Sequence, residues 1–246
     1  MQIFARKRYP VCAGQYRNEW KYICTEKEMA VLEARIMAVL ERDIHSRDDS
    51  GGYEIHSLYF DDIKNSCAKE NDAGDSQRFK YRIRYYGGQS DVLKLERKEK
   101  RNGRCHKEAC SLSGEQYAKI LSGYASEVIW ETDEPLLKQF SAHCMSMGFR
   151  PKVIIDYQRK AYVDPVLNVR VTFDENISVS DDTSEFLSGD YLKIPLQDEH
   201  MHILEVKFDA ILPSHIRMLM TNRCLVQTAF SKYYYGRKKL LEMGRR

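Results

Sequence analysis

Eight segments of the chain alternate apolar and polar residues with a period of two, which is the pattern of a half-buried β-strand. These segments are residues 16–24, 53–61, 78–86, 91–100, 103–111, 152–163, 166–175 and 200–208. Few helical segments separate them, so the connections do not suit the crossovers of a parallel sheet. The pattern therefore predicts an antiparallel sheet or barrel.

Five other segments place apolar residues at helical spacing, at residues 26–42, 113–121, 134–147, 213–221 and 232–243. The first follows Thr25, with Glu28 three residues later as in a capping box. Its predicted apolar stripe consists of Met29, Leu32, Ile36, Val39 and Leu40. Polar stretches at residues 43–52, 71–77 and 178–189 predict loops. None is long enough for a domain linker, which predicts one α+β domain over residues 1–246 with its core at 16–243.

The composition favours a folded chain without a membrane span. Hydrophobic residues make up 43% of the 246 positions, too many for a disordered chain, and no run of 18 apolar residues occurs. No apolar segment follows the basic residues at 6–8, so no secretory signal peptide is expected. The seven cysteines are odd in number and form no Cys-x-x-Cys motif, which favours reduced thiols and a cytoplasmic location.

Charge is nearly balanced over the whole chain, with 39 Lys and Arg against 36 Asp and Glu. That balance argues against a broad basic face for nucleic acid. Within the predicted strands, however, charged side chains share one face, because residues i and i+2 point the same way. The sets on one face are Lys80, Arg82 and Arg84; Lys94, Glu96, Lys98 and Lys100; Glu19 and Lys21; Glu205 and Lys207; Tyr157 and Arg159; and Arg170, Thr172 and Asp174.

Two interpretations fit these charged faces. In the first, an open sheet turns its charged face to water, which is ordinary for an antiparallel sheet. In the second, a barrel closes around the charged face and helices pack outside it. Burying so many cations is costly unless a ligand of opposite charge fills the lumen, as phosphate chains with a divalent metal would. The periodicity alone does not choose between the two.

Six sequence strings add a resemblance. RNEWKY, KYRIRYYG, LKLERKEKRNGRCHKE, DYQRKAY, ILEVKF and FSKYYYG occur in this order between residues 16 and 236. Together they resemble the catalytic domain of the vacuolar transporter chaperone (VTC) family, the polyphosphate polymerases of the triphosphate tunnel metalloenzyme superfamily. The resemblance implies an antiparallel eight-stranded tunnel barrel, lined by basic residues and a few glutamates, with helices packed outside.

The resemblance also implies roles for individual residues. The implied phosphate-binding residues are Lys21, Arg82, Arg84, Lys94, Lys98, Lys107, Tyr157, Arg159, Arg170, Lys207, Ser231 and Lys232. The implied catalytic residues are Arg82, Arg84, Lys94, Arg159 and Glu205. Glu205 is the principal implied ligand of a divalent cation, Mn²⁺ or Mg²⁺, with Glu19 and Glu96 as helpers.

Two positions depart from the family pattern. Arg17 replaces the first glutamate of the ExExK motif that is common in the wider superfamily, which removes one metal ligand. Ala229 stands where some of the polymerases carry a further lysine, three residues before Lys232. The implied set still contains ten cations and three carboxylates, and a tunnel of that composition attracts small polyanions.

The implied reaction is transfer of the γ-phosphoryl group of ATP to phosphate or polyphosphate, with release of ADP. The attacking phosphate oxygen is already ionised at neutral pH, so no strong general base is needed. A triphosphate or polyphosphate hydrolase of the same fold and a non-catalytic polyphosphate or nucleotide binder remain alternatives, although Glu205 argues mildly against the binder. Eukaryotic family members add a sensor domain and membrane helices, for which this chain has no room. We therefore expect a membrane-protein partner to supply any anchor.

Overall fold

The computed structural model describes residues 16–46, 52–196, 201–221 and 225–245. Eight long strands occupy the eight segments that the alternation predicts, and every pairing between them is antiparallel. They are β1 (Asn18–Thr25), β3 (Tyr53–Asp61), β4 (Gln77–Tyr86), β5 (Leu93–Arg101), β6 (Arg104–Leu112), β7 (Arg150–Asp164), β8 (Val169–Ser180) and β10 (Met201–Phe208). The predicted start of the last strand, His200, lies outside the described residues.

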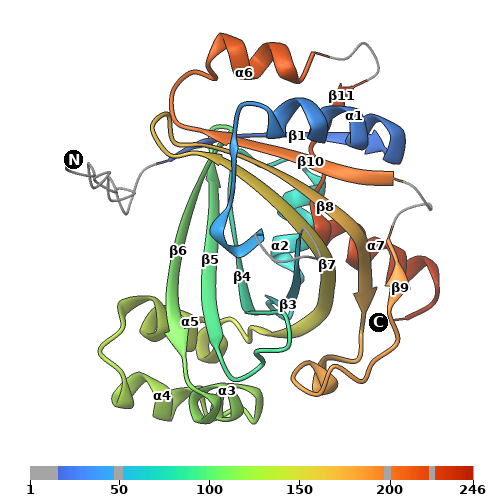
Figure 1. Cartoon of the computed structure of the whole chain (residues 1–246). Helices are drawn as coiled ribbons and strands as arrows, with labels where there is room; N and C mark the ends of the chain where they lie inside the picture. Colours follow the sequence, from blue (N-terminus) through green and yellow to red (C-terminus); the bar gives the residue numbers. More distant parts are fainter. Residues whose placement is uncertain (1–15, 47–51, 197–200, 222–224, 246) are drawn as a thin grey trace.

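The strands form one sheet in the order β11-β1-β10-β8-β7-β3-β4-β5-β6. Two-residue strands extend it: β11 (Val226–Gln227) pairs with β1, β2 (Glu41–Arg42) with β7, and β9 (Ile194–Pro195) with β8. The sheet curls strongly into a half-barrel (Figure 1). Its edges approach each other where Arg17 and Cys105 exchange two backbone hydrogen bonds, of 2.9 and 2.8 Å. The fold is thus of the tunnel type.

Seven α-helices accompany the sheet in the described part of the chain. They are α1 (Glu26–Met37), α2 (Ser66–Asp72), α3 (Gly114–Leu121), α4 (Ala125–Glu131), α5 (Pro135–Ser146), α6 (Ser214–Leu219) and α7 (Lys232–Glu242). Two short 3₁₀ turns, η1 (Ile44–Ser46) and η2 (Thr183–Glu185), complete the elements. The α+β class is confirmed, and none of the described helices has the length and hydropathy to span a membrane.

The helices cover the apolar faces of the strands, in two core clusters. In one cluster, Ile83 of β4 packs with Val128 and Phe140 of α4 and α5. In the other, Val206 of β10 packs with Leu32 of α1. Burial of these outward-facing side chains drives the helices onto the sheet and leaves the charged faces on its concave side.

The capping box at the start of α1 is confirmed. Thr25 Oγ1 accepts from the backbone N–H of Glu28 at 3.3 Å, and Glu28 Oε2 accepts from the backbone N–H of Thr25 at 2.9 Å. The predicted end at residue 42 is wrong, because the helix stops at Met37 and the chain turns back to pair β2 with β7. Val39 is consequently 50% exposed rather than part of the buried stripe.

Other boundaries also differ from the predictions. Helices α2 and α4 are short and were not predicted, and Asn71 belongs to α2 rather than to a loop. Ser178 and Ser180 extend β8, since pairing with β7 outweighs the polar composition there. The predicted loop 43–52 contains η1, and its residues 47–51 lie outside the described residues.

The five cysteines that the structure describes, Cys24, Cys67, Cys105, Cys110 and Cys144, are all free thiols. Cys12 and Cys224 lie outside the described residues. Burial raises the pKa of the Cys24 thiol to about 12 and that of Cys110 to about 11. Thiols of this kind stay protonated at neutral pH and are poor nucleophiles. The functional site is therefore expected among the charged residues of the concave face rather than among these thiols.

Candidate functional site

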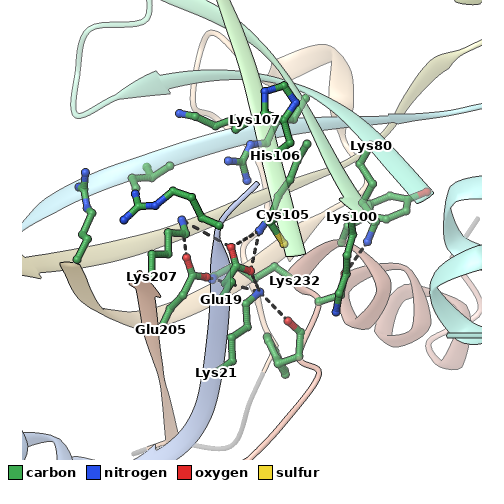
Figure 2. A pocket seen from close by; sticks show the side chains of 18 of the residues that line it. Glu19, Lys21, Lys80, Lys100, Cys105, His106, Lys107, Glu205, Lys207 and Lys232 are labelled. Atoms are coloured by element: carbon green, nitrogen blue, oxygen red, sulfur yellow. Dashed lines mark hydrogen bonds and ion pairs between the residues drawn. The ribbon is translucent and has the colours of Figure 1, made fainter. Parts of the chain in front are cut away.

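The concave face of the sheet encloses a cavity of about 500 Å³. Among the described residues, its wall contains thirteen Lys and Arg side chains and three Asp and Glu side chains, a formal excess of ten positive charges. Figure 2 shows these side chains converging from several strands on a common space. The second interpretation of the strand pattern is therefore correct in placing the charged face inside, where the half-barrel curls around it. Such a field focuses small polyanions into the cavity.

Most of the residues implied by the resemblance come together in this cavity. Those that line it are Glu19, Lys21, Arg82, Arg84, Lys98, Lys107, Tyr157, Arg159, Arg170, Glu205, Lys207, Ser231 and Lys232. They come from strands β1, β4, β5, β6, β7, β8 and β10 and from the start of α7. Segments far apart in the sequence thus share one cavity, and the alternation of each strand decides which of its side chains reach it.

Two implied residues are not part of the cavity wall. Lys94 is exposed, and its ammonium lies 5.6 Å from the ring centre of Tyr86 in a cation–π contact. The strand places Lys94 on the correct face, at the start of β5 opposite Arg84, but its side chain does not line the cavity. The structure therefore does not bring Lys94 to the site, and its implied catalytic and phosphate-binding roles lack geometric support.

Glu96 is the second of these, since it lies behind the wall with 1% of its surface exposed. Its Oε2 accepts from Nε and Nη2 of Arg82 at 2.7 and 2.6 Å, and its Oε1 accepts from the Lys107 ammonium at 3.1 Å. Arg82 and Arg84 hold the pKa of the Glu96 carboxyl well below its usual range, against the effect of burial. Glu96 does not line the cavity and is paired with Arg82 and Lys107, so the geometry makes it a positioning residue rather than a metal ligand.

Two carboxylates do face the cavity together, Glu19 of β1 and Glu205 of β10. The Lys21 ammonium lies between them, 3.3 Å from Glu19 Oε1 and 3.5 Å from Glu205 Oε2. Lys98 bonds both oxygens of Glu19 at 2.7 Å, and Lys207 contacts Glu205 Oε1 at 2.6 Å (Figure 2). Three ammonium groups thus surround two carboxylates.

These ammonium groups control the ionisation of the pair. Burial and mutual repulsion would raise the pKa of both carboxyls, but the surrounding lysines outweigh these effects and hold both values below the usual range. Burial lowers the pKa of Lys207 to about 8, although Glu205 and Glu19 oppose this effect. Both carboxylates are therefore ionised at neutral pH and line the cavity, where a divalent cation would replace the lysine ammonium groups that bond their oxygens.

The Glu19–Glu205 pair fits the requirements of Mg²⁺ or Mn²⁺. Such an ion is commonly held by one or two carboxylates together with substrate phosphates, and Lys21 shows that a positive charge is accepted between these two side chains. No group of three or more His, Cys, Asp or Glu side chains suited to a metal occurs in the described ranges. The remaining ligands would have to be phosphate oxygens and water.

Tyrosines orient the two arginines of β4. Tyr59 accepts from Nη1 of Arg82 at 2.9 Å, and Tyr157 accepts from Nη2 of Arg84 at 2.9 Å. Ser57 also accepts from Nε of Arg84, at 3.1 Å. These neutral acceptors fix the guanidinium planes together with the Glu96 carboxylate, which pairs with Arg82 and lies 3.6 Å from Nη1 of Arg84. The wall as a whole keeps its excess of positive charge for phosphate.

Asp174 of β8 is a residue whose importance the sequence reasoning missed. It is 0% exposed and receives Nε and Nη2 of Arg159 at 2.6 and 2.7 Å. The ammonium of Lys232, at the start of α7, reaches the same carboxylate at 2.5 Å. The alternation along β8 did place Asp174 on the same face as Arg170. Its two partners, Arg159 and Lys232, come from other elements, and the sequence pattern does not show those contacts.

Four basic residues of the wall were also missing from the implied set: Arg17, Arg78, Lys80 and Lys100. Arg17 precedes β1, and the other three lie on β4 and β5. These three alternate in register with residues of the set. Arg78 pairs with Lys100 and Lys80 with Lys98 across the antiparallel ladder. The alternation along the strands did place Lys80 and Lys100 on the charged faces, and it extends to Arg78, whereas the resemblance did not mark any of the three.

Comparison with curated proteins gave no match. Solved structures gave several. A proposed adenylate cyclase of Bacillus halodurans has 12% identity and a TM-score of 0.48, with 83% of this chain and 86% of that chain covered. A proposed adenylate cyclase of Vibrio parahaemolyticus has 12% identity and a TM-score of 0.44, with 94% and 87% covered. A protein of Pyrococcus horikoshii OT3 has 13% identity and a TM-score of 0.45, with 93% and 99% covered.

The family comparison is more direct, because it matches nearly the whole described sheet. The VTC domain family matches residues 16–241, which extend from the residue before Arg17 to the last turn of α7. This range contains the cavity wall and the Glu19–Glu205 pair. The chain belongs to the VTC domain family.

Proposed function

We propose that this protein transfers the γ-phosphoryl group of ATP to the end of an inorganic polyphosphate chain inside its tunnel, and that ADP is released. The observation that carries this proposal is the cavity of about 500 Å³ with thirteen cationic side chains and three carboxylates in its wall. A dense row of fixed cations around a narrow cavity suits a chain of phosphates better than a ligand with a single charge.

The protein's own residues act by binding and orienting phosphate. Arg82, held by Glu96 and Tyr59, and Arg84, held by Tyr157, place guanidinium groups in the tunnel wall for phosphate oxygens. Their charges and those of the lysines stabilise the negative charge on the transferring group, which is the main task in phosphoryl transfer. Arg159 is fixed in place by Asp174.

A divalent cation, Mn²⁺ or Mg²⁺, is the proposed cofactor, with Glu205 and Glu19 as its protein ligands. When bound, such an ion bridges phosphate oxygens and neutralises the charge that develops on them. Glu96 is assigned instead to positioning Arg82 and Lys107. The acceptor is a phosphate oxygen that is already ionised, so the protein needs to align it rather than deprotonate it.

We place this activity in the cytoplasm, where ATP is present and thiols remain reduced. The substrates are then ATP and inorganic polyphosphate or phosphate, with no role for nucleic acid.

The proposal is tested by incubating the purified protein with γ-labelled ATP, Mn²⁺ and a short polyphosphate primer, and separating the products on a gel. A ladder of labelled chains together with ADP is the expected result. Labelled orthophosphate alone would identify a hydrolase of the same fold, and tight ATP or polyphosphate binding without turnover would identify a binding module.

Two variants make this assay specific. Glu205→Ala removes a proposed metal ligand and Arg82→Ala removes a guanidinium, and both should abolish the ladder while thermal unfolding shows an intact fold. Glu115→Ala, on the exposed surface of α3, is the matched control and should retain full activity. Full activity in both tunnel variants would overturn the assignment.

A further inference from the structure

The cations of the tunnel wall fall into two groups. Ten of the thirteen have a carboxylate oxygen within 4.0 Å. The other three, Arg78, Lys80 and Lys100, have no such ion pair within the described ranges of the chain. All three lie at one end of the cavity, on adjacent strands β4 and β5.

Like charges face one another directly at this end. Arg78 is the cross-strand partner of Lys100, and Lys80 is the cross-strand partner of Lys98. Like charges at directly opposite positions of an antiparallel pair destabilise the sheet. Lys98 is paired with Glu19, but Arg78, Lys80 and Lys100 have no carboxylate partner in the described ranges, which indicates that an external anion supplies the missing countercharge.

Lys80 is the most constrained of the three. Its ammonium donates to Oδ1 of Asn71 at 2.8 Å and to Oγ of Ser231 at 2.8 Å, and it lies 5.3 Å from the ring centre of Tyr233. These partners come from α2, from the N-cap of α7 and from α7 itself. They hold the amine in a fixed place but contribute no negative charge, so the amine can take a proton or lose one without breaking an ion pair.

We propose that Arg78, Lys80 and Lys100 form a phosphate subsite at this end of the tunnel, and that Lys80 takes up a proton from solvent when a phosphate group occupies the subsite. The ligand is a phosphate unit of an anionic chain, with Ser231 and Lys80 as its nearest polar groups. The inference rests on the proposed function, because it requires that phosphate chains enter the tunnel.

The electrostatic surroundings of Lys80 support proton uptake. Burial lowers the pKa of Lys80 to about 7, and the positive charges of Lys21 on β1, Arg78 on β4 and Lys98 on β5 act in the same direction. Burial also lowers the pKa of Lys100, with Arg78 contributing. A phosphate dianion beside Lys80 reverses this balance and raises its pKa.

The consequence is a pH-dependent affinity with a defined sign. A ligand that raises the pKa of Lys80 binds more tightly when the amine is protonated, so affinity is highest below pH 7. Above that value each bound ligand brings a proton with it, and affinity falls by up to about tenfold per pH unit until the pKa of the occupied state is reached.

The test uses the full chain, tripolyphosphate as the probe and EDTA to remove metal. Calorimetric titrations at pH 7.5 in two buffers with different ionisation enthalpies give the number of protons taken up per ligand. Wild-type protein and Lys80→Met are compared, and affinities are measured from pH 6 to pH 9. Lys207 and tripolyphosphate titrate in the same range, so the difference between the two proteins is the quantity of interest.

We expect Lys80→Met to take up fewer protons than wild type, to bind at least tenfold more weakly at pH 6 and to bind nearly as well at pH 9. Lys80→Arg, which stays charged, should bind without the extra proton. Lys152→Met is the matched control, because burial and Arg237 also lower the pKa of Lys152 but this residue lies outside the tunnel. It should match wild type.

Two results would overturn the inference, and they are distinguishable. If wild type binds tripolyphosphate but Lys80→Met shows the same proton uptake and the same pH profile, the subsite is wrong and the proposed function stands. If folded wild type does not bind tripolyphosphate between pH 6 and pH 9, both the subsite and the proposed function fail. Thermal unfolding of each variant, with and without tripolyphosphate, identifies any loss of affinity that comes from misfolding. If Lys80→Met is misfolded, the proton uptake of Lys80→Arg is compared with that of wild type instead.

Discussion

Arg159 and Asp174 face each other on neighbouring strands and form a bidentate ion pair inside the tunnel, with Nε–Oδ1 and Nη2–Oδ2 distances of 2.6 and 2.7 Å. The same carboxylate holds Lys232 at the start of α7. One buried aspartate therefore links two phosphate-binding candidates from different elements. Its loss would leave two buried cations without their countercharge, which is a costly arrangement.

The first prediction concerns stability. Asp174→Asn should lower the free energy of unfolding by about 3–5 kcal/mol, since removal of one partner of a buried pair exposes the other to the full desolvation cost. Urea denaturation measures this change. Asp209→Asn is the matched control, because Asp209 pairs with Arg17 in a more exposed position and should cost about 0–1 kcal/mol. Equal losses in the two variants would contradict the prediction.

The second prediction is the pH dependence of the same pair. Burial acts to raise the pKa of Asp174, but Arg159 and Lys232 outweigh it and lower the value to about 2. A depressed carboxyl pKa contributes stability that is present above the unfolded value, near 3.9, and is lost as pH falls toward the folded value. The difference in unfolding free energy between wild type and Asp174→Asn should therefore be constant from pH 7 to 5 and shrink between about pH 4 and 2. A constant difference down to pH 2 would argue against it.

Much of the fold follows from the alternation of residues along the strands. Tyr81 and Ile83 pack against helices while Arg82 and Arg84 face the cavity, and this division is visible in the sequence because each strand separates its two faces. Closure of the sheet is not visible in this way. It depends on the approach of Arg17 to Cys105, two positions 88 residues apart that share no local pattern.

The same limit applies to the candidate site: the sequence shows which face of a strand a residue lies on but not its long-range partners. The alternation along the strands places Lys80 and Asp174 on the tunnel face, but their roles depend on residues of other elements. Lys80 donates to Ser231. Asp174 accepts from Arg159 and Lys232. Lys94 illustrates the opposite case, since it lies on the correct face of its strand but does not line the cavity. The alternation of residues predicts which face of the sheet a side chain lies on, whereas the curvature of the sheet decides whether that side chain reaches the cavity.

The third prediction tests Glu96 as a positioning residue. Glu96→Gln keeps the shape of the side chain but removes the charge that holds Arg82 and Lys107. A guanidinium displaced by about 1 Å from its working position costs about a hundredfold in rate, so kcat should fall by about that factor. Steady-state kinetics of chain synthesis measure it. Glu108→Gln, whose carboxylate pairs with Arg97 at a more exposed position, should leave kcat unchanged.

The fourth prediction separates metal ligands from positioning residues. Glu205→Gln and Glu19→Gln should each weaken Mn²⁺ binding at least tenfold, about 1.4 kcal/mol, measured from the electron paramagnetic resonance signal of free Mn²⁺. Both variants should also bind tripolyphosphate more tightly without metal, because each removes a negative charge from the tunnel wall. Glu96→Gln should change Mn²⁺ affinity little. An equal loss in Glu96→Gln would place the metal elsewhere.

The fifth prediction concerns the helix that carries Ser231 and Lys232 to the tunnel. Gly236 lies in the middle of α7, and a Cβ there would come within 2.7 Å of Ile155 Cδ1 and 3.2 Å of Val179 Cγ2. Gly236→Ala should therefore lower the free energy of unfolding by about 1–3 kcal/mol through overpacking, although alanine favours the helix by about 1 kcal/mol. Urea denaturation measures the net change.

A double variant shows whether the close approach of α7 is the cause. Ile155→Val alone removes Cδ1 and should cost about 0.5–1.5 kcal/mol, but in the Gly236→Ala background it removes the clashing atom. The two losses should then sum to more than the loss in the double variant, since the substitutions are coupled through one contact. Additive losses would mean that α7 moves freely. In that case Gly236→Ala should also leave polyphosphate synthesis unchanged, because Lys232 would keep its place beside Asp174.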